Sequence, residues 1–333
     1  MQLRTLPSSD KQVSVIGVGG MSFSDFYGAV TEEDAIAVLD AGIAAGINHI
    51  DTANVYGNGK SETIIGNYFD AHPGLRDKLV LATKAGIAKR PNSVERDFRN
   101  DYDHLRSELE GSLRRLKTDH VDLFYLHRRD QRVPIETAME SLCRFKEEGL
   151  IRGIGLSEIA PTTLELASKI AQVTAVQSEY SLATRSPELG LLQRCERLNT
   201  LFVAFSPVGR GLLTDQQKTA DEVLDLPWLK TNPRFQTPNL ERNIDATRAF
   251  RDYARALGMT TAQLAVNWVI SKSQNIVTIP GTRSDRHLAS HINAGQHMLG
   301  ADIIARCEEL LPVGWAHGDR YSEANWRGPE RFC

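Results

Sequence analysis

The sequence predicts a (β/α)8 barrel, formed by a single domain over residues 1–333. Two observations indicate this fold. A short apolar run followed by a helical segment occurs eight times along the chain, and the runs are unbroken, as in parallel strands that are buried on both faces. Eight parallel strands that alternate with helices close most simply into a barrel. An open, doubly wound sheet is the alternative.

The expected strands span residues 13–16, 47–50, 78–83, 121–126, 151–156, 173–176, 201–205 and 276–279. The expected helices span about 31–45, 61–69, 102–117, 135–147, a segment starting at 161, 187–198, 244–257, 261–271, 284–292 and 301–310. Thr31 and Asp34 resemble a capping box, and Gly46 is a typical helix stop. Pro161 suits the first turn of a helix.

Two segments do not follow the alternation. Residues 209–243 contain three prolines, and we expect a long loop with little regular structure, of the kind that often forms a functional lid. Residues 312–333 form a polar and aromatic tail without a usable period. The glycines at 17–20 do not indicate a doubly wound dinucleotide fold, because Ser22 occupies the position of the third glycine.

Composition excludes several classes of protein. The net charge of -3 gives no general attraction to nucleic acid or anionic lipid. No apolar run is long enough to cross a bilayer, and residues 1–12 lack the apolar core of a secretory signal. The four cysteines are far apart and show no zinc-ligand spacing, so we expect a cytoplasmic protein with reduced thiols and no metal.

The segment Gly46 to Glu62, GINHIDTANVYGNGKSE, is the most informative in the chain. Asp51 ends an apolar run, and Tyr56 follows five residues later, directly before Gly57. A purely structural alternative is that Asp51 caps the next helix and Tyr56 packs on the rim.

Polar or glycine residues follow nearly all of the expected strands. They are Asp51, Lys84, His127, Ser157, Gln177, Ser206, and Gly281 with Thr282 and Arg283. In a barrel the carboxyl ends of the strands meet on one rim, where active sites lie. Singly, Lys84 could be a solvated charge and His127 a hydrogen-bonded rim residue, but the whole set favours an active site.

Asp51, Tyr56, Lys84 and His127 suit the reduction of a carbonyl group. A lysine ammonium stabilises a neighbouring phenolate and makes the tyrosine a better acid, while a carboxylate keeps the lysine charged. A neutral histidine can donate a hydrogen bond to the carbonyl oxygen. No side chain supplies hydride, so a nicotinamide or a flavin is implied. No nucleophile elbow or HExxH motif is present, and only Asp51 and Glu158 could serve as paired carboxylates for glycoside hydrolysis.

The sequence resembles the aldo-keto reductases at three ordered motifs. These are DTANVYG at 51–57, GSLRRLKTDHVDLFYLH ending at His127, and IPGTRSDRHL at 279–288. The HRRD and FSPVGRG segments are most similar to the branch that includes perakine reductase and the potassium-channel β subunits. The resemblance implies a (β/α)8 barrel that binds NADPH and reduces a small carbonyl substrate, with Tyr56 as the general acid of a tetrad with Asp51, Lys84 and His127.

The resemblance also implies a set of cofactor-binding residues. Ser157 and Gln177 would hold the nicotinamide carboxamide, and Phe205 would stack on its ring. The complete implied set is Gly20, Met21, Asp51, Ser157, Gln177, Phe205, Ser206, Pro207, Val208, Gly209, Arg210, Leu212, Gly281, Thr282, Arg283, His287 and His291. Three positions depart from the common pattern: Glu158 replaces Asn near the carboxamide, and Ser290 and His291 replace Glu and Asn near the adenine.

The expected function is therefore NADPH-dependent reduction of aldehydes or ketones. The alternative is a cofactor-binding subunit that senses redox state with little turnover. Phe23, Tyr56, His127 and Trp228 are the expected substrate contacts, and Tyr27 and Phe235 could join them or simply anchor their loops.

Overall fold

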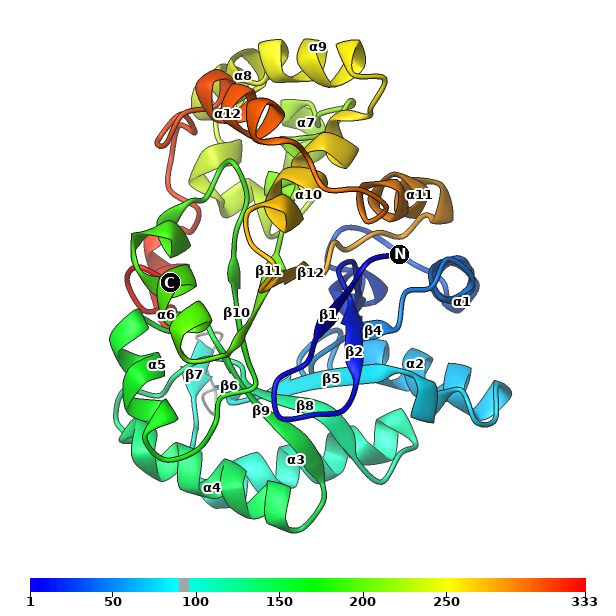
Figure 1. Cartoon of the computed structure of the whole chain (residues 1–333), viewed down its shortest axis with the longest axis vertical. Helices are drawn as coiled ribbons and strands as arrows, with labels where there is room; N and C mark the ends of the chain where they lie inside the picture. The colour runs from blue at the N-terminus through cyan, green and yellow to red at the C-terminus, as the bar shows by residue number, and fades with distance from the viewer. Residues whose placement is uncertain (90–95) are drawn as a thin grey trace.

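The computed structural model describes residues 1–89 and 96–333. Eight parallel strands form a sheet in the order β12-β11-β10-β9-β8-β5-β4-β3. The sheet closes because Ile16, just before β3, forms a parallel bridge with Thr278 in β12. Helices surround the strands (Figure 1). The predicted (β/α)8 barrel is confirmed, and the open doubly wound alternative is wrong.

The barrel strands are β3 (Val18–Gly19), β4 (His49–Asp51), β5 (Val80–Ala85), β8 (Val121–Leu126), β9 (Ile151–Ser157), β10 (Ala175–Glu179), β11 (Leu201–Phe205) and β12 (Ile276–Thr278). Two antiparallel pairs lie outside the barrel sheet: β1 (Leu3–Thr5) with β2 (Gln12–Ser14), and β6 (Ile87–Lys89) with β7 (Arg96–Phe98). The prediction for the first strand was wrong in register. Residues 13 and 14 of the expected strand belong to the hairpin strand β2, and the barrel strand is instead β3 at Val18 and Gly19.

The helices are α1 (Glu32–Ala44), α2 (Lys60–Ala71), α3 (Tyr102–Leu116), α4 (Ile135–Glu147), α5 (Pro161–Ser168), α6 (Leu191–Arg197), α7 (Ala220–Leu224), α8 (Asn239–Ala246), α9 (Arg248–Ala256), α10 (Thr261–Ser271), α11 (Asp285–Ala294) and α12 (Ala301–Leu310). The capping box of Thr31 and Asp34 is present at α1. One expected helix, at 244–257, is divided at Thr247 into α8 and α9.

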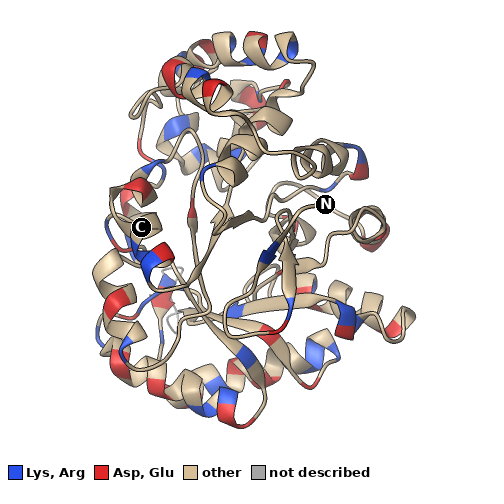
Figure 2. Cartoon of the chain, in the orientation of Figure 1, with Lys and Arg blue, Asp and Glu red and all other residues tan. Residues whose placement is uncertain are grey.

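Two apolar layers hold the barrel together. The interior layer includes Val80, Ala82, Leu123 and Val203, and the hairpin side chains Leu6 and Val13 belong to the same cluster. The outer layer lies between the strands and the surrounding helices. Charges of both signs are mixed along the outer helices in the view of Figure 2, which agrees with the small net charge.

The segment 209–243 is more ordered than predicted. It contains α7, short 3-10 helices and the start of α8, and it has an apolar core of its own. The buried members of that core are Leu212, Val223, Leu226, Leu229, Phe235 and Leu240. The apolar residues of this segment have no regular spacing, so its helices and its core could not be predicted from the sequence.

The C-terminal tail also packs against the barrel. Arg320 and Tyr321 are buried, Trp315 donates a hydrogen bond to the carbonyl of Leu182 (2.8 Å), and the carbonyl of Cys333 accepts one from Ser186 (2.8 Å). In Figure 1 the C-terminus lies beside α6. The tail therefore joins the side of the barrel on which β10 and α6 lie.

Candidate active site

The candidate active site lies at the carboxyl ends of the barrel strands. Side chains alternate between the two faces of a strand. Val80 and Ala82 of β5 point into the barrel interior, so Lys84 does as well; Leu123 and Tyr125 of β8 set the same direction for His127. The period of two residues thus brings strand-end side chains together that are far apart in the sequence.

Lys84 is at the centre of the predicted tetrad. Its fully buried ammonium forms an ion pair with Asp51 and donates to the carbonyl of Thr52 (2.8 Å). The Tyr56 hydroxyl lies 3.5 Å from Lys84 Nζ. Burial disfavours the charged form of Lys84, but Asp51 and Tyr56 outweigh it and raise its pKa. The lysine is therefore a fixed positive charge beside the tyrosine oxygen.

His127 completes the tetrad as a neutral ring. Its ring lies edge-on to that of Tyr56, with 5.8 Å between centroids. Burial, followed by the positive charges of Arg128, Lys84 and Arg96, lowers its pKa well below the usual value. Its Nδ1 atom is buried and has no hydrogen-bond partner among the described residues. A neutral imidazole in this position can donate a hydrogen bond to a carbonyl oxygen.

The turn that carries Tyr56 requires its glycines. Gly57 and Gly59 have φ of +61° and +93°, and Asn58 between them has +51°. A Cβ at Gly57 would lie 2.9 Å from the Cβ of Lys60. This left-handed turn leads directly into α2 and leaves Tyr56 only partly buried, facing Lys84 and His127.

The residues implied for the nicotinamide end lie next to the tetrad. Gln177 donates to the second oxygen of Asp51 (2.8 Å), and Ser157 accepts a hydrogen bond from Arg128 (3.0 Å). Phe205 ends β11 half-buried against the interior layer, with part of its ring uncovered. A carboxamide could therefore form hydrogen bonds with Ser157 and Gln177, and an aromatic ring could stack on Phe205.

The residues implied for the phosphate end surround the start of α11. Ser284 precedes this helix without a side-chain cap, but the Arg286 N–H donates to Asp285 Oδ1 (2.6 Å), so only part of the first-turn N–H groups remains available to an anion. Thr282 instead donates to the carbonyl of Ser284 (3.0 Å), and Arg283 and His287 are exposed beside it. This set of donors fits a phosphate group.

The other predicted cofactor residues are divided between two settings. Gly20, Met21, Ser206, Pro207, Val208, Gly209 and Gly281 lie in the loops that follow β3, β11 and β12. Arg210 pairs with the buried carboxylate of Glu179, and Leu212 is buried in the core of the 209–243 segment. His291, on α11, is only 5% exposed, so nothing in this arrangement supports its predicted contact with the cofactor.

The expected substrate contacts show a similar division. Phe23 is fully buried in the outer core layer, so the structure does not place it at the mouth of the barrel. Phe235 anchors the core of its own loop. Trp228 is part of an aromatic group with Phe26 and Tyr321, at ring distances of 5.3 and 6.1 Å.

Arg96, Arg128 and the tail residues of this region were not predicted from the sequence, whereas Arg210 was expected at the cofactor. Arg96 and Arg210 stack on the Trp228 ring, at 5.2 and 5.5 Å. Arg320 forms an ion pair with Glu158 (2.8 Å), so the carboxylate of Glu158 binds a residue of the C-terminal tail. Arg128 could have been noticed because it directly follows His127, whereas Arg320 lies 162 residues from Glu158 and gave no signal.

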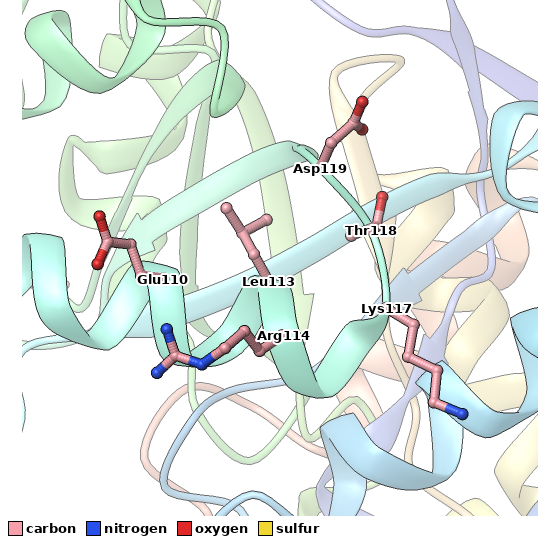
Figure 3. Close-up of a pocket in the computed structure, with 6 residues that line it drawn as sticks. All are labelled: Glu110, Leu113, Arg114, Lys117, Thr118 and Asp119. Atoms are coloured by element: carbon pink, nitrogen blue, oxygen red, sulfur yellow. The ribbon is translucent and has the colours of Figure 1, made fainter.

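A surface hollow at the other end of the barrel is separate from this site. It is lined by Glu110, Leu113, Arg114, Lys117, Thr118 and Asp119 (Figure 3). Thr118 and Asp119 precede β8, whereas His127 follows it. The hollow therefore lies at the amino ends of the strands, away from the tetrad.

Three further findings concern absent features. Within residues 1–89 and 96–333, no helix is both long and apolar enough to cross a membrane. The same residues contain no group of three or more His, Cys, Asp or Glu that could hold a metal ion. All four cysteines are free thiols.

Comparisons with known proteins agree with the fold and identify the family. The sequence model of the Aldo/keto reductase family matches residues 15–312. "Aldo-keto reductase yakc [NADP(+)]" of Schizosaccharomyces pombe is 33% identical over 96% of this chain and 95% of its own length. "Probable aldo-keto reductase 1" of Glycine max is 35% identical over 93% of this chain and 89% of its own length.

Solved structures show the same relationship. A glycerol dehydrogenase from Gluconobacter oxydans has a TM-score of 0.81 at 25% identity, covering 93% of this chain and 94% of its own. An aldo/keto reductase from Klebsiella pneumoniae, in complex with NADP and acetate, has a TM-score of 0.71 at 25% identity, covering 93% and 95%. The chain belongs to the aldo/keto reductase family, and the predicted family is confirmed.

Proposed function

We propose that this protein is an NADPH-dependent reductase that converts aldehydes or ketones to alcohols, with Tyr56 as the general acid. The observation that carries the proposal is the position of the Tyr56 hydroxyl, 3.5 Å from a buried lysine ammonium that is paired with Asp51. The NADP(+) in the name of the fission-yeast relative and the NADP in the Klebsiella structure support the choice of cofactor.

When bound, NADPH supplies the hydride that the carbonyl carbon accepts. The side chains of the protein polarise the carbonyl oxygen and then protonate it. His127, as a neutral ring, donates a hydrogen bond to the carbonyl oxygen and polarises it. Tyr56 gives its proton to that oxygen, and the Lys84 ammonium stabilises the phenolate that remains. Asp51 keeps the lysine charged and fixed in place.

The test is a steady-state assay of NADPH oxidation across a panel of aldehydes and ketones, combined with a fluorescence titration of NADPH binding. We expect tight binding and turnover of at least one class of carbonyl compound. Tight binding without turnover of any compound would favour a redox-sensing subunit. Absence of nicotinamide binding would contradict both functions.

A further inference from the structure

Arg128 is a cation beside the active site that has no carboxylate partner. Its Nη1 atom donates to the carbonyl of His127 (2.6 Å) and to Ser157 Oγ (3.0 Å). Among the described residues, none bonds to its Nη2 or Nε atoms. The side chain is half-buried. One edge of the guanidinium is thus fixed on the rim between β8 and β9, and the other edge is available.

The acidic side chains near Arg128 are already paired with other arginines. Glu158 pairs with Arg320 (2.8 Å), Glu330 with Arg129 (2.7 Å), and Asp130 with Arg132 (2.8 Å). Glu179 pairs with Arg210 and has Arg234 at 3.7 Å and Arg320 at 3.8 Å. Among the described residues Arg128 forms no ion pair, and these four neighbouring carboxylates are engaged by other arginines.

Arg96 adds a second positive charge on the same side of the mouth. Its guanidinium lies over the Trp228 ring. Its pKa is lowered by burial and then by the charge of Arg128, and both arginines help to lower the pKa of His127. The two guanidinium groups are therefore near enough to each other, and to His127, for their charges to interact. An anion bound between them would relieve their repulsion.

We propose that the substrate carries a carboxylate, and that the free edge of Arg128 binds it, with Arg96 adding to the attraction. The proposal rests on the proposed function and narrows its substrate class to aldehydes or ketones that bear an acid group. A guanidinium edge matches a carboxylate with two parallel hydrogen bonds. Because Arg128 is hydrogen-bonded to Ser157 at the end of β9, on the same rim as His127, a carboxylate held there orients the attached carbonyl toward Tyr56 and His127.

A role for Arg128 in binding the cofactor phosphates is a different explanation for this charge. The loops that fit the phosphates follow β11 and β12, whereas Arg128 lies between β8 and β9, with β10 separating the two pairs. The position of Arg128 therefore favours the substrate. NADPH affinity measured in a variant distinguishes the two roles.

The kinetic test compares p-carboxybenzaldehyde with p-formylbenzamide, which has nearly the same shape and no charge. In the wild type we expect kcat/KM for the acid to exceed that for the amide by roughly tenfold or more. Arg128→Gln should lower kcat/KM for the acid by roughly ten- to a hundredfold, as for loss of one charge-assisted contact, and leave the amide within about threefold. Arg114→Gln makes the same charge change at the far end of the barrel and should alter neither value.

A binding test is independent of turnover. The complex with NADP is titrated with benzoate and with benzamide while its tryptophan fluorescence is recorded. Benzoate should bind roughly tenfold more tightly than benzamide in the wild type, and Arg128→Gln should remove the difference. A retained preference for benzoate in a protein that reduces no carbonyl would support the anion site and overturn the proposed reaction.

Three outcomes would overturn the anion site itself. The first is equal kcat/KM for acid and amide in the wild type together with equal binding of benzoate and benzamide. The second is an equal loss for both aldehydes in Arg128→Gln, which would show that Arg128 acts through His127 or Ser157. The third is weaker NADPH binding in Arg128→Gln with an unchanged ratio of acid to amide.

Discussion

Lys84 has a side chain that would be costly to bury alone. Its ammonium is removed from water completely, and such a charge needs a partner and hydrogen bonds to persist. Asp51 and the carbonyl of Thr52 supply both. The remaining direction of the ammonium points to Tyr56. The buried pair therefore places one unit of positive charge where a tyrosine oxygen would lose its proton.

Tyr56→Phe removes the proposed acid and leaves the ring in place. We expect carbonyl reduction to fall by roughly 10²–10⁴-fold, as for other losses of a general acid, while NADPH affinity stays nearly unchanged. Steady-state kinetics and a fluorescence titration measure the two quantities. Tyr102→Phe, in α3 against Phe145, is a matched control that should keep full activity. A Tyr56→Phe enzyme that retains most of its activity would show that another group donates the proton.

Arg283 is the residue we expect to distinguish NADPH from NADH. It is exposed next to the uncapped start of α11, and it donates to the carbonyl of Ala29 (2.8 Å). A guanidinium there can bind the 2′-phosphate through charge-assisted hydrogen bonds. Arg283→Ala should weaken NADPH binding by roughly ten- to a hundredfold and leave NADH binding almost unchanged.

Titrations of both cofactors test this assignment. Arg286→Ala, an exposed change in the first turn of α11, is the control and should have a smaller effect on NADPH. Equal weakening of both cofactors in Arg283→Ala, or a wild type that already prefers NADH, would show that this arginine does not recognise the phosphate.

At the scale of elements, the strands explain why sequence patterns located the tetrad. Asp51 and Lys84 belong to the barrel strands β4 and β5, and His127 directly follows β8. Because side chains alternate along a strand, the barrel fold directs all three side chains toward the barrel interior. Helix ends with a cap, such as Thr31 at α1, could likewise be predicted.

The contacts of the tail could not be predicted in the same way. Arg320 meets Glu158, and Glu330 meets Arg129, across long stretches of chain with no periodic pattern. Such ion pairs depend on the finished barrel, and local propensity does not encode them. The run at 13–16 was misassigned in its first half, because a hairpin strand and a buried barrel strand look alike over so few residues.

We expect the start of the 209–243 segment to become more ordered when NADPH binds. Gly209, Arg210 and Gly211 all have positive φ, at +57°, +59° and +109°, directly after β11. The later part is anchored by buried Leu229 and Phe235, whereas the start is held through Leu212 and the ion pair of Arg210 with Glu179. A loop that closes over the cofactor would therefore move mainly at this glycine-containing start.

Hydrogen exchange with and without NADPH measures this closure. Amides from about 206 to 219 should exchange more slowly with the cofactor, while those of the outer helix α4 serve as an internal control. Equal exchange in 206–219 under both conditions would contradict closure of the loop.

At the scale of the whole molecule, three buried histidines link stability to pH. Burial lowers the pKa of His49 to about 4, and burial, followed by the charge of His287, lowers that of His291 to about 4. The pKa of His127 is also well below the usual value, for the reasons given for the tetrad. In the folded protein these rings stay neutral at pH values where the unfolded chain already binds protons.

The direction of the effect follows from that difference. As the pH falls below about 6.5, protons bind the unfolded state preferentially, and the free energy of unfolding decreases until the folded rings titrate. Each fully buried histidine contributes roughly 1 kcal/mol per pH unit. Glu179 affects stability at lower pH than the histidines do. Burial favours its neutral acid, but Arg210, Arg320 and Arg234 lower its pKa to about 2, so its contribution is lost only between about pH 4.5 and 2.

Urea denaturation at about pH 7, 6 and 5 isolates the histidines from that carboxylate. We expect the free energy of unfolding to fall by several kcal/mol across this range, because up to three rings contribute. His49→Asn should reduce the slope by about a third relative to the wild type, since one of three linked protons is removed. His297→Asn, an exposed change away from the three rings, should leave the slope as it is. A free energy of unfolding that stays constant over this range would show that the buried rings are protonated in the folded protein.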